Sequence, residues 1–163
     1  MALFSQEHGL VPLCALATSV TSSADLDSIN MALYDHATIL IIHSASVVGD
    51  NVLYAYGGAT DGTKTAALTF HYRVGSAAPK SATADVLAAD ATSDALTLTA
   101  ASYQGLMLVL EISADEMQAS GTQYQFLTIN FDGTASTGTI AAFAILSKPR
   151  YARAVMPTAI PTS

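Results

Sequence analysis

The feature that most constrains the fold of this chain is a set of strand-like segments that are apolar on both faces. An antiparallel strand with one face in water alternates apolar and polar residues with a period of two, so a continuous apolar run needs a cover on its second face. The sequence has no helix-like segment long enough to supply that cover. We therefore expect another copy of the chain, or a larger assembly, to cover these strands. The four clearest runs are residues 37–43 (ATILIIH), 105–112 (GLMLVLEI), 124–131 (YQFLTINF) and 140–146 (IAAFAIL).

The composition supports the same expectation. Hydrophobic residues make up 51% of the 163 residues and charged residues only 12%, which excludes a disordered chain and leaves a surface poor in charge. A chain of this length suits a single domain. Sparsely charged surfaces are typical of proteins that pack against neighbours, although stable secreted β-proteins share this property.

The charge balance argues against a nucleic-acid partner. The net charge is −7, and a protein that binds phosphates needs a basic stripe, whereas this chain has only six Lys and Arg. Three of the six, Lys148, Arg150 and Arg153, lie close together near the C-terminus. We interpret this segment either as a solvated tail or as a basic tail that binds an acidic surface.

The cysteine content and the N-terminal pattern limit the choice of compartment. Cys14 is the only cysteine, so it forms no intrachain disulfide, and we expect it to be a small buried hydrophobe. Residues 10–17 resemble a signal-peptide core, but Glu7 precedes them and no Lys or Arg lies before them. No apolar run approaches the length of a membrane span. We expect a soluble, intracellularly made protein with no membrane partner.

The pattern along the chain predicts three regions: an N-terminal arm and linker over residues 1–35, a β-sandwich core over 36–147 and an extended C-terminal tail over 148–163. Short β-like segments separated by turn residues predict an all-β fold, an antiparallel, jelly-roll-like β-sandwich. Residues 113–118 (SADEMQ) predict one helical turn with a capping box. Removing residues 1–24 is expected to leave a folded core. The expected strands are residues 37–43, 51–57, 66–73, 82–88, 95–100, 105–112, 123–131 and 138–147.

Residues 57–64 (GGATDGTK) come near to a phosphate-binding loop, with Thr63 and Lys64 in reversed order. A phosphate loop opens a helix, but the residues that follow alternate as a strand does, and Asp61-Gly62 is a strong hairpin signal. We predict a hairpin turn here and no phosphate site.

The remaining polar residues form no recognisable catalytic or metal-binding motif. The four histidines have no i, i+2 or i, i+4 partner, and no nucleophile elbow is present. Most acids are Asp in turn-like settings, where their side chains cap backbone amides. We therefore predict no catalytic residues, no metal and no cofactor. The tyrosines Tyr54, Tyr56 and Tyr72 are expected to pack in the sandwich or at a subunit boundary.

Four segments are similar to small virion structural proteins of tailed bacteriophages, in particular to capsid decoration (cement) proteins. They are residues 31–38 (MALYDHAT), 68–73 (LTFHYR), 110–117 (LEISADEM) and 145–152 (ILSKPRYA). The resemblance implies a β-sandwich that oligomerises on the capsid exterior, bridges neighbouring capsomers and carries no catalytic residues. It implies the major capsid protein as partner and a virion location after synthesis in the host cytoplasm.

Extended terminal segments are suited to reach neighbouring subunits. Self-association as a homotrimer is expected because shells offer many three-fold positions, with a dimer as the alternative. Competing interpretations are a tail or baseplate component and a carbohydrate-binding β-sandwich; an enzyme ranks last. The candidate partner-binding residues are Leu3, Phe4, Leu10, Lys148, Arg150, Tyr151 and Arg153.

Overall fold

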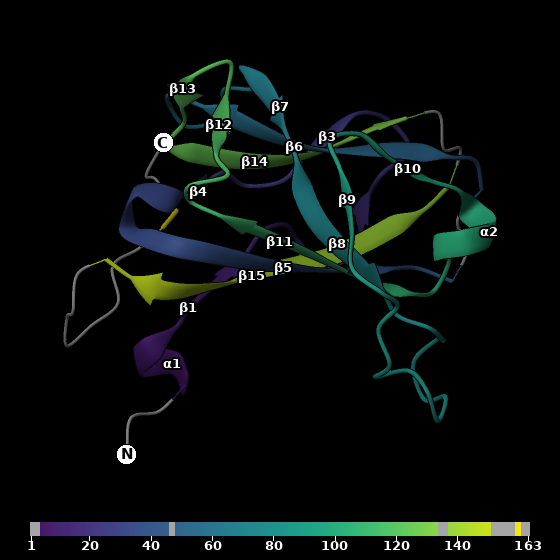
Figure 1. Cartoon of the computed structure of the whole chain (residues 1–163). Coiled ribbons are helices and arrows are strands. Elements are labelled where there is room, and N and C mark those ends of the chain that lie inside the picture. Colours follow the sequence, from purple (N-terminus) through teal and green to yellow (C-terminus); the bar gives the residue numbers. More distant parts are fainter. Residues whose placement is uncertain (1–3, 46–47, 134–136, 151–158, 161–163) are drawn as a thin grey trace.

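Two antiparallel sheets stack face to face, and the side chains that alternate inward from both sheets form one hydrophobic core between them (Figure 1). The computed structural model describes residues 4–45, 48–133, 137–150 and 159–160. The predicted all-β, antiparallel β-sandwich is therefore confirmed. The helical segments are short, as the sequence predicts: α1 (Phe4–Glu7), η1 (Met31–Leu33) and α2 (Ala100–Tyr103).

The seven-stranded sheet contains three of the four runs that are apolar on both faces. These runs are side by side in β15, β5 and β11, so their second faces form one continuous surface. The strand order is β1 (Gly9–Pro12), β15 (Thr139–Pro149), β5 (Tyr34–His43), β11 (Met107–Ser113), β8 (Phe70–Val74) and β9 (Ala91–Ser93), and β2 (Thr18–Ser19) also pairs with β15.

The six-stranded sheet contains the fourth run, in β14, which does alternate. Leu127, Ile129 and Phe131 are buried in the core, while Thr128 and Asn130 face the other way. The strand order is β10 (Leu96–Leu98), β6 (Asn51–Gly58), β14 (Phe126–Gly133) and β3 (Ala24–Asp25); β4 (Ile29–Asn30) pairs with β14 and β7 (Ala66–Leu68) with β6. A separate ribbon joins β12 (Gln118–Ala119) to β13 (Thr122–Gln123).

The glycine-rich segment 57–64 is the hairpin turn that the sequence predicts. It joins the antiparallel strands β6 and β7, and Gly62 at its tip has a φ of 69°, in the left-handed region that favours glycine. Gly57 is packed so closely under the ring of Tyr124 that a Cβ would clash with the ring carbons. Gly62 therefore allows the turn, and Gly57 allows close packing against Tyr124.

Residues 4–35, the described part of the expected arm, do not form a separate arm. Strand β1 is hydrogen-bonded along the edge of the seven-stranded sheet, and Leu13 and Val20 are buried in the core. Strands β2, β3 and β4 in this region are only two residues long, so most of the region has no regular secondary structure. Such short pairings leave no periodic pattern in the sequence, so the expectation of an arm over residues 1–35 is wrong.

Two smaller expectations also need correction. Residues 82–88, expected as a strand, form turns in the connection from β8 to β9, and only Leu87 makes a β-bridge, to Gly75. Residues 114–116 form a tight turn in place of a helical turn, although the carboxylate of Glu116 does accept a hydrogen bond from the Ser113 amide, as a capping box requires.

The expected C-terminal tail is only partly described. Lys148 and Pro149 still belong to β15, and the amide of Arg150 donates to the carbonyl of Leu33 at 3.0 Å. Further on, Ala159 is buried, and its carbonyl accepts a hydrogen bond from the amide of Asn30. The described ends of this region are thus anchored to the sandwich.

Candidate functional site

The outer face of the seven-stranded sheet is apolar over four adjacent strands. In one row across the sheet, Pro12 lies opposite Phe143, Phe143 opposite Leu40, and Leu40 opposite Val109. These positions follow from strand alternation, because their chain neighbours point into the core. We call this surface the apolar face and define it by Leu10, Pro12, Leu40, Ile42, Met107, Val109, Ala141, Phe143 and Ile145.

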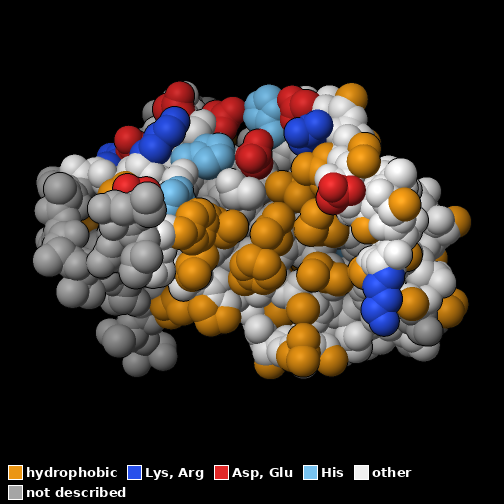
Figure 2. Space-filling view, turned by 90° about the horizontal axis from the view of Figure 1, so that it is seen from below, with side chains coloured by type: hydrophobic (Ala, Val, Ile, Leu, Met, Phe, Trp, Pro, Cys, Tyr) orange, Lys and Arg blue, Asp and Glu red, His pale blue; other side chains and the backbone are white. Residues whose placement is uncertain are grey.

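Much of the apolar face is accessible to solvent. Leu10 is 55% exposed, and Ile42 and Phe143 are each 39% exposed, which is high for large hydrophobic side chains in neighbouring strands. Figure 2 shows the hydrophobic side chains gathered over the middle of this surface, with most of the charged side chains along one border. A contiguous patch of this kind marks an interaction site more often than a free surface.

The charged border follows the β8 side of the sheet. The ring of His71 contacts two carboxylates, with Nδ1 2.9 Å from Asp90 and Nε2 3.4 Å from Glu116. The hydrogen bond to Asp90 and the negative charge of that carboxylate raise the pKa of His71, because they favour the protonated ring. Next to it, Nε of Arg73 donates to the carbonyl of Ala88. These groups are already satisfied within the chain.

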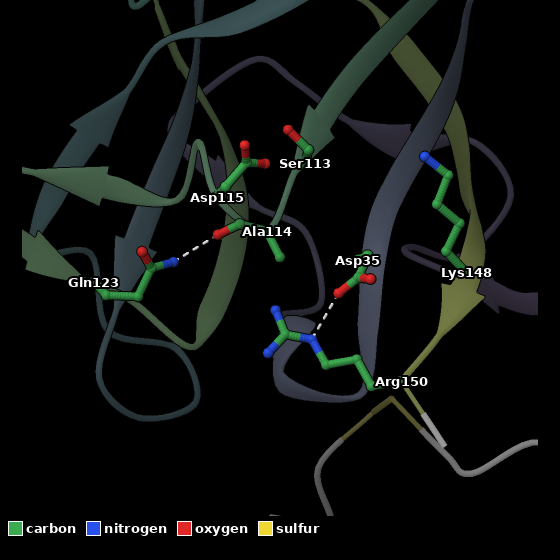
Figure 3. Close-up of a pocket in the computed structure, with 7 residues that line it drawn as sticks. All are labelled: Asp35, Ser113, Ala114, Asp115, Gln123, Lys148 and Arg150. Atoms are coloured by element: carbon green, nitrogen blue, oxygen red, sulfur yellow. Dashed lines mark hydrogen bonds and ion pairs between the residues drawn. The ribbon is translucent and has the colours of Figure 1, made fainter. Parts of the chain in front are cut away.

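A polar pocket of about 550 Å³ opens at the end of the same sheet where β5 begins and β15 ends. Arg150 and Asp35 point toward one another in it, and Nε of Arg150 donates to the Asp35 carboxylate at 2.8 Å (Figure 3). On another wall, the side-chain amide of Gln123 donates to the carbonyl of Ala114 at 2.6 Å. The remaining lining residues are Ser113, Asp115 and Lys148.

The carboxylate of Asp115 remains an acceptor in this pocket. A hydrogen bond from the Ser113 side chain lowers the pKa of Asp115, and the backbone amides and Lys148 act in the same direction. Lys148 makes no ion pair with the described residues. The pocket therefore offers one charge-paired wall and one ammonium group that can bind an anionic group of a partner.

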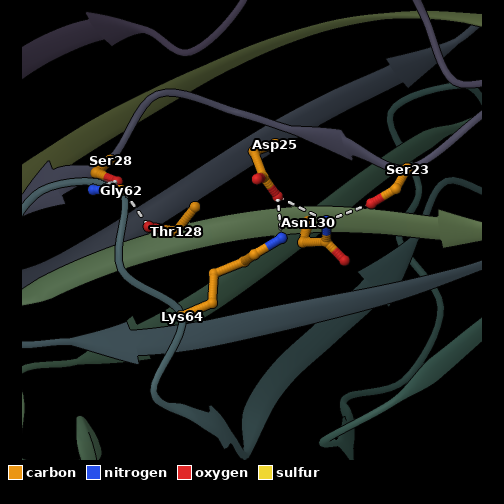
Figure 4. A network of polar contacts seen from close by, with 7 residues as sticks. All are labelled: Ser23, Asp25, Ser28, Gly62, Lys64, Thr128 and Asn130. Carbon is orange, nitrogen blue, oxygen red and sulfur yellow. Dashed lines mark hydrogen bonds and ion pairs between the residues drawn. The ribbon is translucent and has the colours of Figure 1, made fainter.

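Over β14, the outer face of the six-stranded sheet is covered by the chain itself. Asn130 donates to the carboxylate of Asp25 at 2.6 Å and to the hydroxyl of Ser23 at 3.2 Å, and Lys64 bonds to the same carboxylate at 2.8 Å (Figure 4). The hydroxyls of Ser28 and Thr128 are 2.6 Å apart. Segment 23–28 and the turn that contains Lys64 thus lie over β14 and satisfy its outward polar groups. Beside them, the rings of Tyr54 and Tyr56 stack with centroids 5.4 Å apart.

One histidine lies inside the sandwich. His43 is buried at the end of β5 against the rings of Phe131 and Tyr103, and neither ring nitrogen has a hydrogen-bond partner among the described residues. Burial lowers the pKa of His43 to about 4, although the backbone carbonyl of Leu106 acts in the opposite direction. His43 is therefore a neutral part of the core at neutral pH.

The structure divides the sequence-predicted partner-binding residues between two places. Leu10 lies on the apolar face, and Lys148 and Arg150 line the polar pocket. Phe4 is exposed in α1 and stacks on the ring of His8 with centroids 4.2 Å apart. Leu3, Tyr151 and Arg153 lie outside the described residues. Sequence reasoning missed Asp35. It predicted from the unbroken apolar runs that residues 37–43 and 140–146 need a cover on their second face, but it did not include their outward residues among the partner-binding residues.

Neither a metal site nor a membrane span is found in the described part of the chain. Its His, Cys, Asp and Glu side chains form no group of three or more placed to hold a metal ion. None of its helices is long and apolar enough to cross a bilayer.

The sequence matches no protein-family model and no curated protein.

Proposed function

We propose that this chain is a non-enzymatic virion structural protein that decorates a bacteriophage capsid and stabilises it by bridging neighbouring capsomers. The observation that carries the proposal is the apolar face, a hydrophobic surface on four neighbouring strands where Leu10, Ile42 and Phe143 stay exposed to solvent. Burial of apolar surface stabilises a contact by about 25 cal/mol per Å², so a repeated contact of this kind strengthens a shell. Its partners are copies of itself and the major capsid protein, and its place is the capsid exterior.

The four phage-like segments support this identity because they meet at one end of the sandwich. Register places Tyr34 opposite Pro149, His36 opposite Ser113, and Glu111 opposite His71. Segments 31–38, 68–73 and 110–117 and the described part of 145–152 therefore include parts of four neighbouring strands, and all but segment 68–73 contribute residues to the polar pocket. Residues far apart in the sequence that resemble one class of protein thus form one local surface, which is suited to contact the capsid.

The chemistry of the polar pocket fits attachment better than catalysis. The Asp35 carboxylate is paired with Arg150, and the lowered pKa of Asp115 makes that carboxyl a poor proton donor. Asp35 and Asp115 balance the charges of Arg150 and Lys148, and Lys148 makes no ion pair with the described residues. Its ammonium group is suited to pair with an acidic side chain of the shell.

Labelling of purified particles tests the proposed location. An antibody or a tag on this protein, applied to separated heads and tails of the phage that encodes it, is expected to mark the heads. Labelling of tails alone would instead support a tail or baseplate component, and absence from purified particles would contradict a virion role.

A pair of variants at Lys148 tests attachment through the polar pocket. Purified protein is added to capsids stripped of it, and bound protein is measured by co-sedimentation. Lys148→Glu, which reverses the charge, is expected to reduce binding several-fold, whereas Lys148→Arg, which keeps the positive charge, is expected to bind as the unmodified protein does. Equal binding by both variants would place the attachment elsewhere.

A carbohydrate-binding module is the second candidate function, and one observation favours it. Tyr54 and Tyr56 form a stacked, half-buried ring pair on the outer face of the six-stranded sheet, and Lys64 lies over the ring of Tyr56 at 5.8 Å. Aromatic rings on a sheet surface can stack on sugar rings. Binding on a glycan array that is lost in Tyr54→Ala and Tyr56→Ala would support this function.

A further inference from the structure

The apolar face has the anatomy of a protein interface. Phe143 and Leu40 lie opposite each other near its middle, and Val109 continues their row on β11. Charged side chains begin only at the border, with Glu111 on β11 and with Arg73 and His71 on β8. An apolar centre surrounded by a polar rim is typical of the contact patch between two proteins.

We infer that a second copy of this chain covers the apolar face, so that two copies stack their seven-stranded sheets face to face in a dimer. The inference rests on the proposed structural function, because it names the partner for the surface that carries that proposal. A two-fold contact places one patch against its own copy, and the patch must therefore be complementary to itself. A sheet surface without charge at its centre meets this condition, because nothing in it repels an identical surface.

Charge restricts which surfaces of two copies can meet. The chain has a net charge of −7, so two copies repel each other over most of their surface. The apolar face is the exception. At its border, His71 is paired with Asp90 and Glu116 of the same chain and needs no counter-ion from a partner. The centre of the face carries no charged side chain, so the repulsion between two copies that meet there is smallest.

The area of the face suits a weak, concentration-dependent dimer. It spans four strands about 4.8 Å apart and about five residues at 3.3 Å each, a footprint of roughly 300 Å². Because side chains roughen the surface, two such faces bury on the order of 1,000 Å², near the lower limit for specific interfaces. We expect a dissociation constant on the order of micromolar.

The connection between β8 and β9 extends the contact. It projects beyond the seven-stranded sheet on the side of the apolar face (Figure 1). Together with Ile42 and Met107 it encloses a cavity of about 350 Å³, whose other walls come from Ala77, Pro79, Lys80, Ala84 and Asp85. This cavity adjoins the face, so side chains of a stacked copy can enter it.

Symmetry favours two copies over three for this surface. In a ring of three, each subunit uses two different patches to contact its two neighbours. A self-complementary face is fully occupied once two copies have bound each other. The homotrimer expected from the resemblance stays a prediction about the particle, where the dimer would be one contact among several.

Mass as a function of concentration tests the dimer. Sedimentation equilibrium of the full chain from about 1 µM to about 1 mM brackets the expected constant and should show a shift from 16.8 kDa to twice that mass. Phe143→Glu should raise the dissociation constant at least tenfold, because it buries a charge in the contact. Val48→Glu, at a position that is 57% exposed but off the face, should leave the constant unchanged. Circular dichroism checks that both variants fold.

Disulfide cross-linking gives a second test that does not depend on a disruptive change. Positions near a two-fold axis meet their own copies, so Phe143→Cys in a Cys14→Ser background should form covalent dimers under mild oxidation. Thr97→Cys, exposed on the outer face of the six-stranded sheet, should not. Cross-linking through position 97 but not 143 would overturn the inference.

A monomer at all concentrations, or an oligomer indifferent to Phe143→Glu, would also overturn it. Neither result would remove the protein from the capsid, which the labelling of heads and tails tests separately. The dimer and the virion role can therefore fail independently.

Discussion

The outer faces of the two sheets solve the same physical problem in different ways. On the six-stranded sheet, the outward residues Thr128 and Asn130 are polar, and the chain lays its own segment 23–28 over them with a hydrogen-bond partner for each. On the seven-stranded sheet, the outward residues Leu40 and Phe143 are apolar, and Phe143 is 39% exposed. One face is completed within the molecule, and the other is suited to be completed by a partner.

The difference shows what a two-sided apolar run does and does not indicate. Residues 124–131 look apolar throughout, yet Thr128 and Asn130 restore the alternation of β14, and its outer face is polar. In β5 and β15 the apolar residues of the runs occupy both odd- and even-numbered positions, so they point to both faces of the sheet. Single polar residues at every second position therefore decide whether a sheet face can be covered by hydrogen bonds or only by another apolar surface.

Deletion of residues 1–24 should have the largest effect, because these residues support both sheets. It removes strand β1 and the buried side chains of Val11, Leu13 and Val20. At about 1.5–3 kcal/mol for each side chain, the loss approaches the whole stability of a typical domain. We expect no cooperative thermal unfolding of this variant by circular dichroism. Deletion of residues 1–7 keeps β1 and should unfold cooperatively; an intact fold in the longer deletion would restore the interpretation of an arm.

Acid should destabilise the fold because it favours protonation of His43, which is buried in the core between the two sheets. The pKa of this ring is about 4 in the folded chain and about 6.5 in the unfolded chain. As the pH falls below about 6.5 the unfolded state binds the proton first, so stability should fall by about 3 kcal/mol by pH 4. Urea unfolding at several pH values measures this loss. His43→Leu should remove that share of the pH dependence, and an unchanged profile would show that the ring is accessible to water or paired.

Removal of the Asn130 side chain should destabilise the fold without affecting association. Asn130→Ala breaks the bonds to Asp25 and Ser23 and should cost about 1–3 kcal/mol in the free energy of unfolding. Asp132→Ala, two residues further along β14 and exposed, should change it by less than about 0.5 kcal/mol. Denaturant unfolding gives both values. A loss of dimer in Asn130→Ala would contradict the division between the two faces.

A polar substitution on the apolar face should have the smallest effect on stability. Ile145→Thr changes a half-buried outward side chain and should cost less than about 1 kcal/mol. Its neighbour Leu146 points into the core, and Leu146→Thr should cost about 2–5 kcal/mol. Thermal unfolding of dilute protein compares the two variants. Equal costs would mean that the apolar face is covered within a single chain.

Much of the fold could be predicted from local patterns. Alternating and apolar runs located the long strands, and Asp61-Gly62 located the β6–β7 hairpin, because strand formation and turn chemistry act over a few residues. The run in β5 also pointed to a second cover. The sequence could not show that β5, β11 and β15 are adjacent, since strand order depends on pairings between distant residues.

The contribution of the first 35 residues and the polar pocket could not be predicted in this way. Strands β3 and β4 are two residues long and pair with β14, about 100 residues away, so neither produces a periodic pattern in the sequence. Asp35 and Arg150 are 115 residues apart and meet only because β5 and β15 share a register. Residues 82–88 were predicted as a strand, but residues 82–85 form turns and only residues 86–88 hydrogen-bond to the end of β8 and the residues after it.

Hydroxyl-radical footprinting tests the central claim most directly, because it reports the exposure of individual side chains on both faces in one sample. The unmodified protein is oxidised at about 1 µM and at about 1 mM, on either side of the expected dissociation constant. The account predicts that oxidation of Met107 and Phe143 falls several-fold at the higher concentration, while that of Tyr54 and Tyr56 stays constant. Protection of the tyrosines, or of none of the four residues, would contradict it.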